Sequence, residues 1–270
     1  MRVLKRIIFI GLLLQFTLPA SAELRIEITK GVDNAVRVAV VPFAWRGKRK
    51  PPIDVSDVVS SDLGLSGRFE ALPTTQMLSF PNDTSEVLPR DWRMLGVEYL
   101  VVGYLEPREV SVRLHFELYS VLRQTVVAKQ TIEGLPMDLR DMAHHVSDVV
   151  FNELTGIKGA FSTQIMYVTA MDDDQGRHFA LNIADADGYR VRKVLESIEP
   201  ILSATWSPDG KMVAYVSFEQ DGRPAIYLHE VITGNRQILT SFAGLNGAPS
   251  FSPDGKEMAL VLSKDGNPDI

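Results

Sequence analysis

The 270-residue sequence contains no cysteine, so a disulfide, a cysteine metal ligand and a cysteine nucleophile are all excluded. Stability must then come from the hydrophobic core, and a hydrophobic content of 45% is sufficient for one. Positive charge is also scarce, because 28 Lys and Arg residues stand against 34 Asp and Glu. A chain with this balance lacks the basic face that a phosphate backbone needs, so the sequence predicts no nucleic-acid partner.

The sequence also lacks the motifs of common enzymes and cofactor sites. It has no G-x-S-x-G elbow, no G-x-G-x-x-G or Walker loop and no H-E-x-x-H. The acidic stretch at 171–178 has its glycine in the wrong place for a calcium loop and is interpreted as a solvated hairpin tip. His144 and His145 are adjacent, and adjacent helical residues point about 100° apart, so structural roles are expected for both. The sequence therefore predicts no enzyme activity, no metal and no cofactor.

Long hydrophobic runs are missing except at the N-terminus, where residues 7–18 are apolar and follow three basic residues. This run is shorter than the ~20 residues that span a bilayer. It is followed by Ala20, Ser21 and Ala22, which match a signal-peptidase site. We therefore predict a cleaved secretory signal over 1–22, with cleavage between Ala22 and Glu23. Cleavage would change the formal charge from −6 to −9, which disfavours direct binding to an anionic membrane.

The first half of the mature chain has the pattern of a small α/β domain, expected over 35–157. An alternating strand at 24–31 precedes it and is interpreted as a mobile arm over 23–34. Periodicity predicts a strand at 35–43 that is buried on both faces, and a helix over 51–67 that starts at Pro51. Three antiparallel strands are expected at 97–107, 110–120 and 125–134, the middle one with one face in water. A turn of helix is expected near 91–96.

The helix expected over 137–156 has the clearest period in the chain. Its apolar residues recur at i, i+3, i+4 and i+7, and Gly156 follows as a stop signal. Beyond it, GIKGAFST at 156–163 is interpreted as the boundary between domains.

The second half repeats one phrase. SATWSPDGKMVAYVS (203–217) returns as APSFSPDGKEMALVL (248–262), 45 residues later, and a weaker copy starts near 165. Ser-Pro-Asp-Gly is a tight turn, and about four short strands per repeat are typical of a propeller blade. Residues 160–270 are therefore expected to form about two and a third blades. Since a blade needs neighbours in a closed ring, a longer native chain is expected. The fold class is α+β, with a small α/β domain followed by a partial β-propeller.

Three segments together resemble the TolB family of periplasmic propeller proteins of the Tol–Pal envelope system. They are VAVVPF at 38–43, GVEYLVVGYLE at 96–106 and NGAPSFSPDG at 246–255. The resemblance covers residues 23–270. It implies a six-bladed propeller and a periplasmic scaffold that links TolA to the lipoprotein Pal and supports outer-membrane integrity and constriction at division. Other outer-membrane proteins are further expected partners, and the membrane would be reached only through partners.

The same resemblance implies two binding regions. The arm would bind the C-terminal domain of TolA, and an alternating apolar strand at a free end is able to add to a partner's sheet edge. The arm residues are Glu23, Leu24, Arg25, Ile26, Glu27 and Ile28. The central face of the propeller would bind Pal, and the residues expected there are Ser203, Thr205, Leu245, Asn246 and Ala248.

One alternative stays open on the sequence. Secreted peptidases of the prolyl-oligopeptidase type also use Ser-Pro-Asp-Gly blades, and their hydrolase domain would lie outside these 270 residues. The α/β domain at 35–155 carries no catalytic signature, which weighs against that interpretation.

Overall fold

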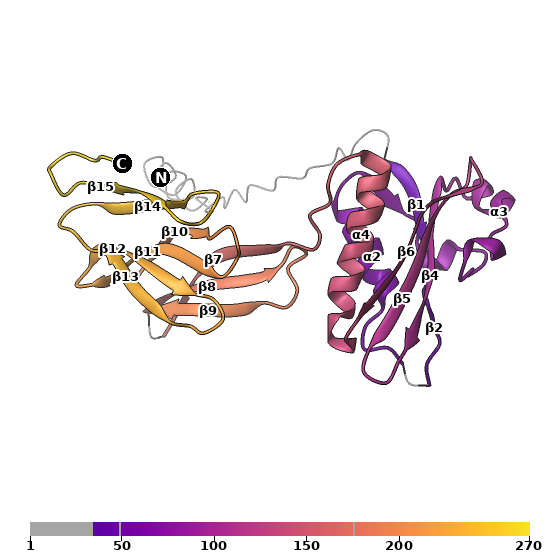
Figure 1. Ribbon diagram of the computed structural model, residues 1–270, viewed down its shortest axis with the longest axis horizontal. Coiled ribbons are helices and arrows are strands. Elements are labelled where there is room, and N and C mark those ends of the chain that lie inside the picture. The colour runs from indigo at the N-terminus through magenta and orange to yellow at the C-terminus, as the bar shows by residue number, and fades with distance from the viewer. Residues whose placement is uncertain (1–34, 49, 175) are drawn as a thin grey trace, which may run out of the picture.

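The computed structural model describes residues 35–48, 50–174 and 176–270, and the predicted signal peptide and arm lie outside them. The chain forms an N-terminal α/β domain and a separate set of all-β sheets, joined by a short linker after α4 (Figure 1). This mixed architecture confirms the predicted fold class. In the described residues no helix is long and apolar enough to cross a membrane.

The N-terminal domain is built on one six-stranded sheet with the order β3-β1-β4-β5-β6, in which β2 also pairs with β4. β1 is parallel to β3 and β4, whereas β4, β5 and β6 are antiparallel neighbours, as the sequence predicted. The strands are β1 (Val36–Val40), β2 (Ala44–Trp45), β3 (Phe69–Ala71), β4 (Tyr99–Pro107), β5 (Val112–Ser120) and β6 (Thr125–Gly134). The helices are α2 (Val55–Leu65), α3 (Pro89–Met94) and α4 (Leu139–Thr155), with 3-10 turns at Thr74–Gln76, Thr84–Glu86 and Pro136–Asp138.

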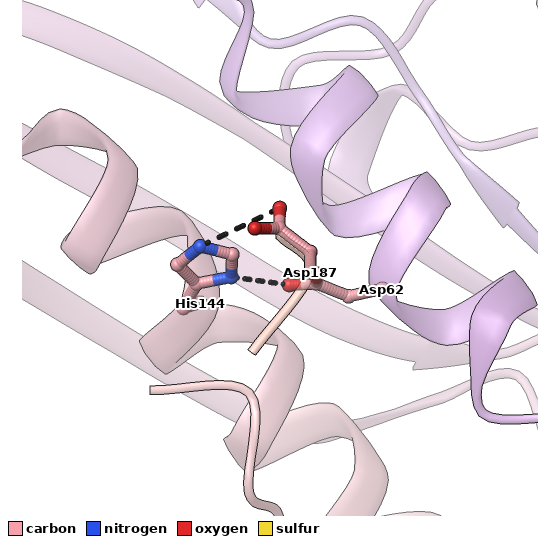
Figure 2. A group of neighbouring side chains, drawn as sticks. All are labelled: Asp62, His144 and Asp187. Carbon is pink, nitrogen blue, oxygen red and sulfur yellow. Dashed lines mark hydrogen bonds and ion pairs between the residues drawn. The ribbon is translucent and has the colours of Figure 1, made fainter. Parts of the chain in front are cut away.

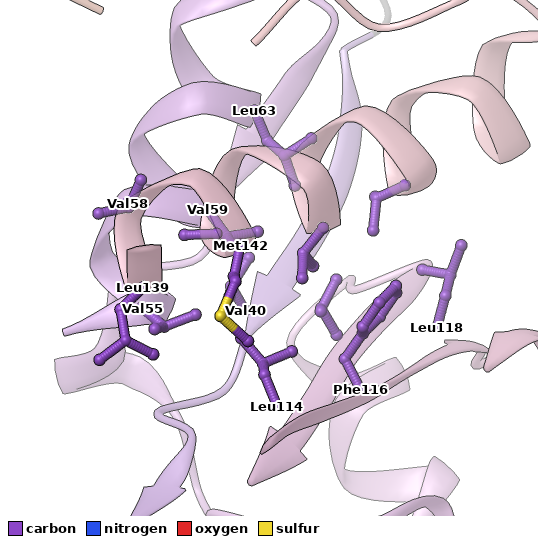
Figure 3. Close-up of a cluster of buried hydrophobic side chains, with 14 of the residues drawn as sticks. Val40, Val55, Val58, Val59, Leu63, Leu114, Phe116, Leu118, Leu139 and Met142 are labelled. Carbon is purple, nitrogen blue, oxygen red and sulfur yellow. The ribbon is translucent and has the colours of Figure 1, made fainter. Parts of the chain in front are cut away.

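Helices α2 and α4 pack side by side on one face of this sheet (Figures 1 and 3). Val59, Leu63 and Val146 are fully buried between the helices and the sheet. Each such side chain contributes on the order of 1.5–3 kcal/mol relative to an exposed one. β1 is buried on both faces, because Val38 and Val40 face the helices while Ala39 and Val41 face the opposite side.

The helix ends follow local chemistry. α2 begins at Val55 and not at Pro51, because the side chain of Asp54 accepts the backbone N–H groups of Ser56 and Asp57 and so caps the helix there. α4 ends at Gly156 as predicted, with φ 71° and a hydrogen bond to the carbonyl of Asn152.

The water-exposed face expected for the strand at 110–120 is wrong. His115, Glu117 and Tyr119 are all at least 92% buried. The segment from Leu72 to Val97 covers part of this face and contributes the buried Trp92, and Thr84 of that segment contacts Glu117. The sheet is therefore covered on both faces here, whereas the alternation in the sequence suggested that one face is exposed to water.

The second half of the described chain forms three stacked sheets of β-propeller type. They are β7-β8-β9, β10-β11-β12-β13 and β14-β15, and each strand pair is antiparallel. The strands are β7 (Gln164–Asp173), β8 (Gly176–Asp185), β9 (Arg192–Ser197), β10 (Ile201–Trp206), β11 (Met212–Gln220), β12 (Arg223–Glu230), β13 (Arg236–Thr240), β14 (Asn246–Phe251) and β15 (Met258–Leu262).

The repeated Ser-Pro-Asp-Gly turn has the same hydrogen bonds in both copies. Ser207 donates from its hydroxyl to Asp209 over 2.7 Å, and Ser252 does the same to Asp254 over 2.7 Å. Gly210 and Gly255 take φ values of 71° and 72°. The turn therefore sets the same connection between the first and second strand of each blade.

Candidate partner-binding face

The candidate site lies where the inner strands of two blades meet. β14 packs against β10, β11 and β12. Between these strands lies a pocket of about 350 Å³. Its lining is apolar or neutral and comes from both blades: Leu202, Ser203, Val216, Phe218, Pro224, Leu245, Asn246, Gly247, Ala248 and Val261.

A repeated backbone irregularity shapes the pocket. Ser203 in β10 has φ 51° and Ala248 in β14 has φ 46°, a left-handed conformation that is rare outside glycine. The pairing register of each strand shifts at this point. Such bulges redirect neighbouring side chains, and both lie at the pocket wall.

Asn246 holds the loop beside the pocket. Its side chain is fully buried, and its amide donates to the carbonyl of Phe242 over 2.7 Å while its Oδ1 accepts the N–H of Phe242 at 3.0 Å. The adjacent Leu245 is 43% exposed, and its backbone is fixed by Ser263 through bonds of 2.7 and 3.1 Å. The loop thus presents an apolar side chain on a fixed backbone.

The structure brings four of the five expected face residues together. Ser203, Leu245, Asn246 and Ala248 all line the pocket. Thr205 is not among the lining residues and lies in the strand, opposite Ala214. The expected arm residues Glu23 to Ile28 and the cleavage site at Ala22 and Glu23 lie outside the described residues.

Sequence reasoning did not single out Val216, Phe218 or Pro224, which come from the hairpin between β11 and β12. The alternation along β11 does indicate two faces, with Val216 and Phe218 on one and the buried Tyr215 and Ser217 on the other. Only the stacking of a second blade shows which of the two faces lines a pocket.

The pocket's chemistry suits an apolar side chain of another protein. No lining residue carries a charge, so the pocket offers no acid, base or charged metal ligand. In the described part of the chain, one group of three possible metal ligands comes together elsewhere, between the two domains: Asp62, His144 and Asp187. The pocket therefore presents a largely apolar surface without a charged group.

Comparison with known proteins gives a consistent result. Residues 24–127 match the family model of the TolB amino-terminal domain, and residues 151–270 match that of the TolB beta propeller domain. The Tol-Pal system protein TolB of Alcanivorax borkumensis is 47% identical over 248 residues, which is 92% of this chain and 56% of that protein. The protein of the same name from Marinomonas sp. is 48% identical over 235 residues, 86% of this chain and 54% of that protein.

Among solved structures, that of TolB from Acinetobacter baumannii superposes with a TM-score of 0.78 at 38% identity. The match covers 90% of this chain and 58% of that chain. The chain therefore spans about half the length of the relatives it matches.

Proposed function

The chain belongs to the TolB family, and on that premise we propose that it is a protein-binding component of the Tol-Pal system and not an enzyme. The peptidase alternative is not favoured, because the relatives that match nearly the whole chain are named for the Tol-Pal system. The proposed location is the periplasm. The signal peptide would direct export and be cleaved after Ala22.

We propose that the pocket between the second and third blades contributes to the binding of Pal. One observation carries this part: two blades place an apolar pocket and an exposed Leu245 on the same face. A partner's apolar side chain that fills such a pocket loses its contact with water, and this is the kind of contact that dominates protein affinity. Binding of TolA is assigned to the arm, residues 23–28. Linking the two proteins would support outer-membrane integrity and constriction at division.

The pocket is tested by titrating the soluble domain of Pal against the chain and two variants. Leu245→Asp places a charge at the pocket and is expected to weaken the affinity at least tenfold. Leu122→Asp, at a position that is 79% exposed in the N-terminal domain, is the matched control and should leave affinity unchanged. Equal affinities for both variants would exclude the pocket from the Pal site.

The arm is tested with the C-terminal domain of TolA. Replacing Leu24, Ile26 and Ile28 by serine removes one face of the expected strand, and at least a tenfold loss of affinity is expected. Replacing Arg25 and Glu27 by serine changes the other face and serves as the control. A chain lacking residues 23–31 that keeps full affinity would rule out the arm as the TolA site.

A further inference from the structure

Helix α4 contacts the first propeller blade through charged side chains. Nε of Arg140 donates to Oδ2 of Asp185 over 3.1 Å, and Nε of Arg190 donates to the same oxygen over 2.7 Å. Arg190 reaches back to Asp141 on α4 over 3.1 Å. Arg140 also pairs with Asp187. Since Asp185, Asp187 and Arg190 belong to the end of β8 and the following loop, these pairs join the two domains.

His144 lies at the centre of this group. It is 1% exposed, and its Nδ1 is 2.8 Å from Oδ2 of Asp62 on α2. On the other edge of the ring, Nε2 is 3.8 Å from Oδ2 of Asp187 (Figure 2). The same nitrogen is 3.9 Å from Oδ2 of Asp185. The imidazole thus stands between a carboxylate of the N-terminal domain and two carboxylates of the propeller.

This placement favours the charged form of the ring. A neutral imidazole has one N–H and one lone pair, so one of its edges would turn a lone pair toward a carboxylate. The imidazolium donates from Nδ1 to Asp62 and, although Nε2 makes no hydrogen bond, turns a positive charge toward Asp187 and Asp185. Ser147 supports this arrangement, because its hydroxyl donates to Oδ2 of Asp62 over 2.6 Å and helps to fix that carboxylate.

On balance, the groups around His144 raise its pKa and so also favour the charged ring. Burial, the largest single influence, lowers the pKa of His144, and the positive charge of Arg140 also opposes protonation. The hydrogen bond and charge of Asp62, with the charge of Asp187, outweigh both and raise the pKa above its ordinary 6.5. Asp141, Asp185 and Arg190 border the same space, in a pocket of about 240 Å³ that His144 and residues 161–164 also line.

We propose that His144 is a proton-operated clamp between the N-terminal domain and the propeller. The imidazolium joins Asp62 on α2 to Asp187 and Asp185 on the first blade and holds the two domains in one orientation. Loss of the proton removes one of the positive charges that, together with Arg140 and Arg190, balance the three carboxylates, and this weakens the contact. Asp62 stays beside His144 in both states, whereas the charge of Asp187, which raises the pKa of His144, is added only on docking. With a higher pKa in the docked state, the clamp is complete at lower pH and is lost as the pH rises through the docked value.

A divalent metal ion is the competing occupant, because Asp62, His144 and Asp187 place possible ligand atoms within 4.8 Å of one another. The geometry disfavours it. The two carboxylates face different nitrogens of the ring, so they do not converge with one nitrogen on a single point. The guanidinium of Arg140 already pairs with Asp185 and Asp187, and it would repel a doubly charged ion more strongly than the singly charged imidazolium.

The first test measures the protonation of His144 directly. The imidazole Cε1–H signal of His144 is assigned in an NMR spectrum by its loss in His144→Gln, and its midpoint is expected above 6.5. Asp187→Asn, on the propeller side, should lower that midpoint while both domains stay folded. His145 is the internal control, because it is exposed on the same helix and its signal should not respond to Asp187→Asn.

The second test measures domain orientation. Since the chain has no cysteine, Leu122→Cys and Ile232→Cys can carry a nitroxide pair, one in each domain and each about 80% exposed. Electron–electron double resonance is recorded one pH unit below and one above the NMR midpoint. One narrow distance is expected at the lower pH and a broader distribution at the higher pH. His144→Gln should be broad at both, and His145→Gln should behave as the parent.

Three results would overturn the proposal. They are a midpoint at or below 6.5, a distance distribution that does not change across the midpoint, and a His144→Gln variant that keeps the parent's pH response. Narrowing of the high-pH distribution by added Zn²⁺ in chelator-treated protein would instead assign the site to a metal.

Discussion

Ser203 and Ala248 occupy the same place in successive blades, 45 residues apart, and both take the left-handed backbone conformation, with φ 51° and 46°. Neither is a glycine, so each holds a conformation that costs about 1–2 kcal/mol for a residue with a Cβ. The cost recurs at the wall of the pocket that we propose as part of the Pal site. Backbone strain that is kept at equivalent positions of a binding face fits a functional role for the bulge.

Replacing Ala248 by glycine relieves this strain. We expect Ala248→Gly to raise the free energy of unfolding by about 1 kcal/mol, in a urea titration followed by circular dichroism. Ala259→Gly is the matched control, because Ala259 is also exposed, lies in the partner strand β15 and does not have a positive φ. It should lose about 0.5–1 kcal/mol. A loss in both variants would show that φ at Ala248 is not strained.

The linker after α4 depends on a close approach that only glycine permits. A Cβ added to Gly159 would lie 2.3 Å from Oδ1 and 2.5 Å from the Cα of Asp148. Asp148 in turn accepts the backbone N–H groups of Phe161 and Ser162 at 2.8 and 3.2 Å. We expect Gly159→Ala to lower the free energy of unfolding by about 2 kcal/mol, because the linker must leave α4.

Gly64 provides the control for that variant. It lies within α2, is exposed, and has no atom within 4 Å of its added Cβ. Gly64→Ala should therefore stabilise the chain by about 0.8 kcal/mol through helix propensity alone. Differential scanning calorimetry of both variants decides the matter, and an unchanged melting temperature for Gly159→Ala would contradict the close contact.

Local features were accessible to sequence reasoning, and contacts between distant segments were not. The C-terminal end of α4, the Ser-Pro-Asp-Gly turn and the buried β1 follow from residues a few positions apart. The burial of Glu117 was missed because its cover, around Trp92, comes from a segment without regular periodicity. The group at His144 joins Asp62 to Asp187, 125 positions away, and no pattern in the sequence predicts that these two residues lie close together.

The low pKa of Glu117 predicts that the N-terminal domain loses stability at acidic pH. Burial raises the pKa of this carboxyl, but hydrogen bonds from Lys129, Thr84 and His115 outweigh it and lower the pKa from 4.5 to about 2. Because the folded value is the lower one, the stabilisation is complete above about pH 4.5 and is lost as the pH falls to about 2. The side chain is 4% exposed, and the shift corresponds to roughly 3 kcal/mol.

The Glu117→Gln variant tests this prediction. We expect it to be less stable than the parent by roughly 3 kcal/mol at pH 7, with the difference disappearing toward pH 2. Glu133→Gln, on the exposed edge strand β6, is the control and should leave the melting temperature unchanged at both pH values. A Glu117→Gln penalty that persists in full at pH 2 would point to lost packing instead of lost charge.

His229 predicts the opposite pH response to His144 within the same chain. It is 97% buried in β12, and burial, followed by the charges of Arg236 and Arg192, lowers its pKa below 6.5. The unfolded chain therefore takes up the proton first, and the free energy of unfolding falls as the pH drops below about 6.5.

In the described residues neither ring nitrogen of His229 has a hydrogen-bond partner, so a leucine of similar volume removes a buried polar group without breaking a bond. We expect His229→Leu to gain about 1 kcal/mol at pH 7 and to lose less stability than the parent between pH 6.5 and 5. The exposed His145→Leu should keep the parent's slope over that range. If His229→Leu instead destabilises the chain at pH 7 by several kcal/mol, the ring nitrogens have partners in solution, and the buried neutral histidine must be reinterpreted as part of a hydrated polar network between the first two blades.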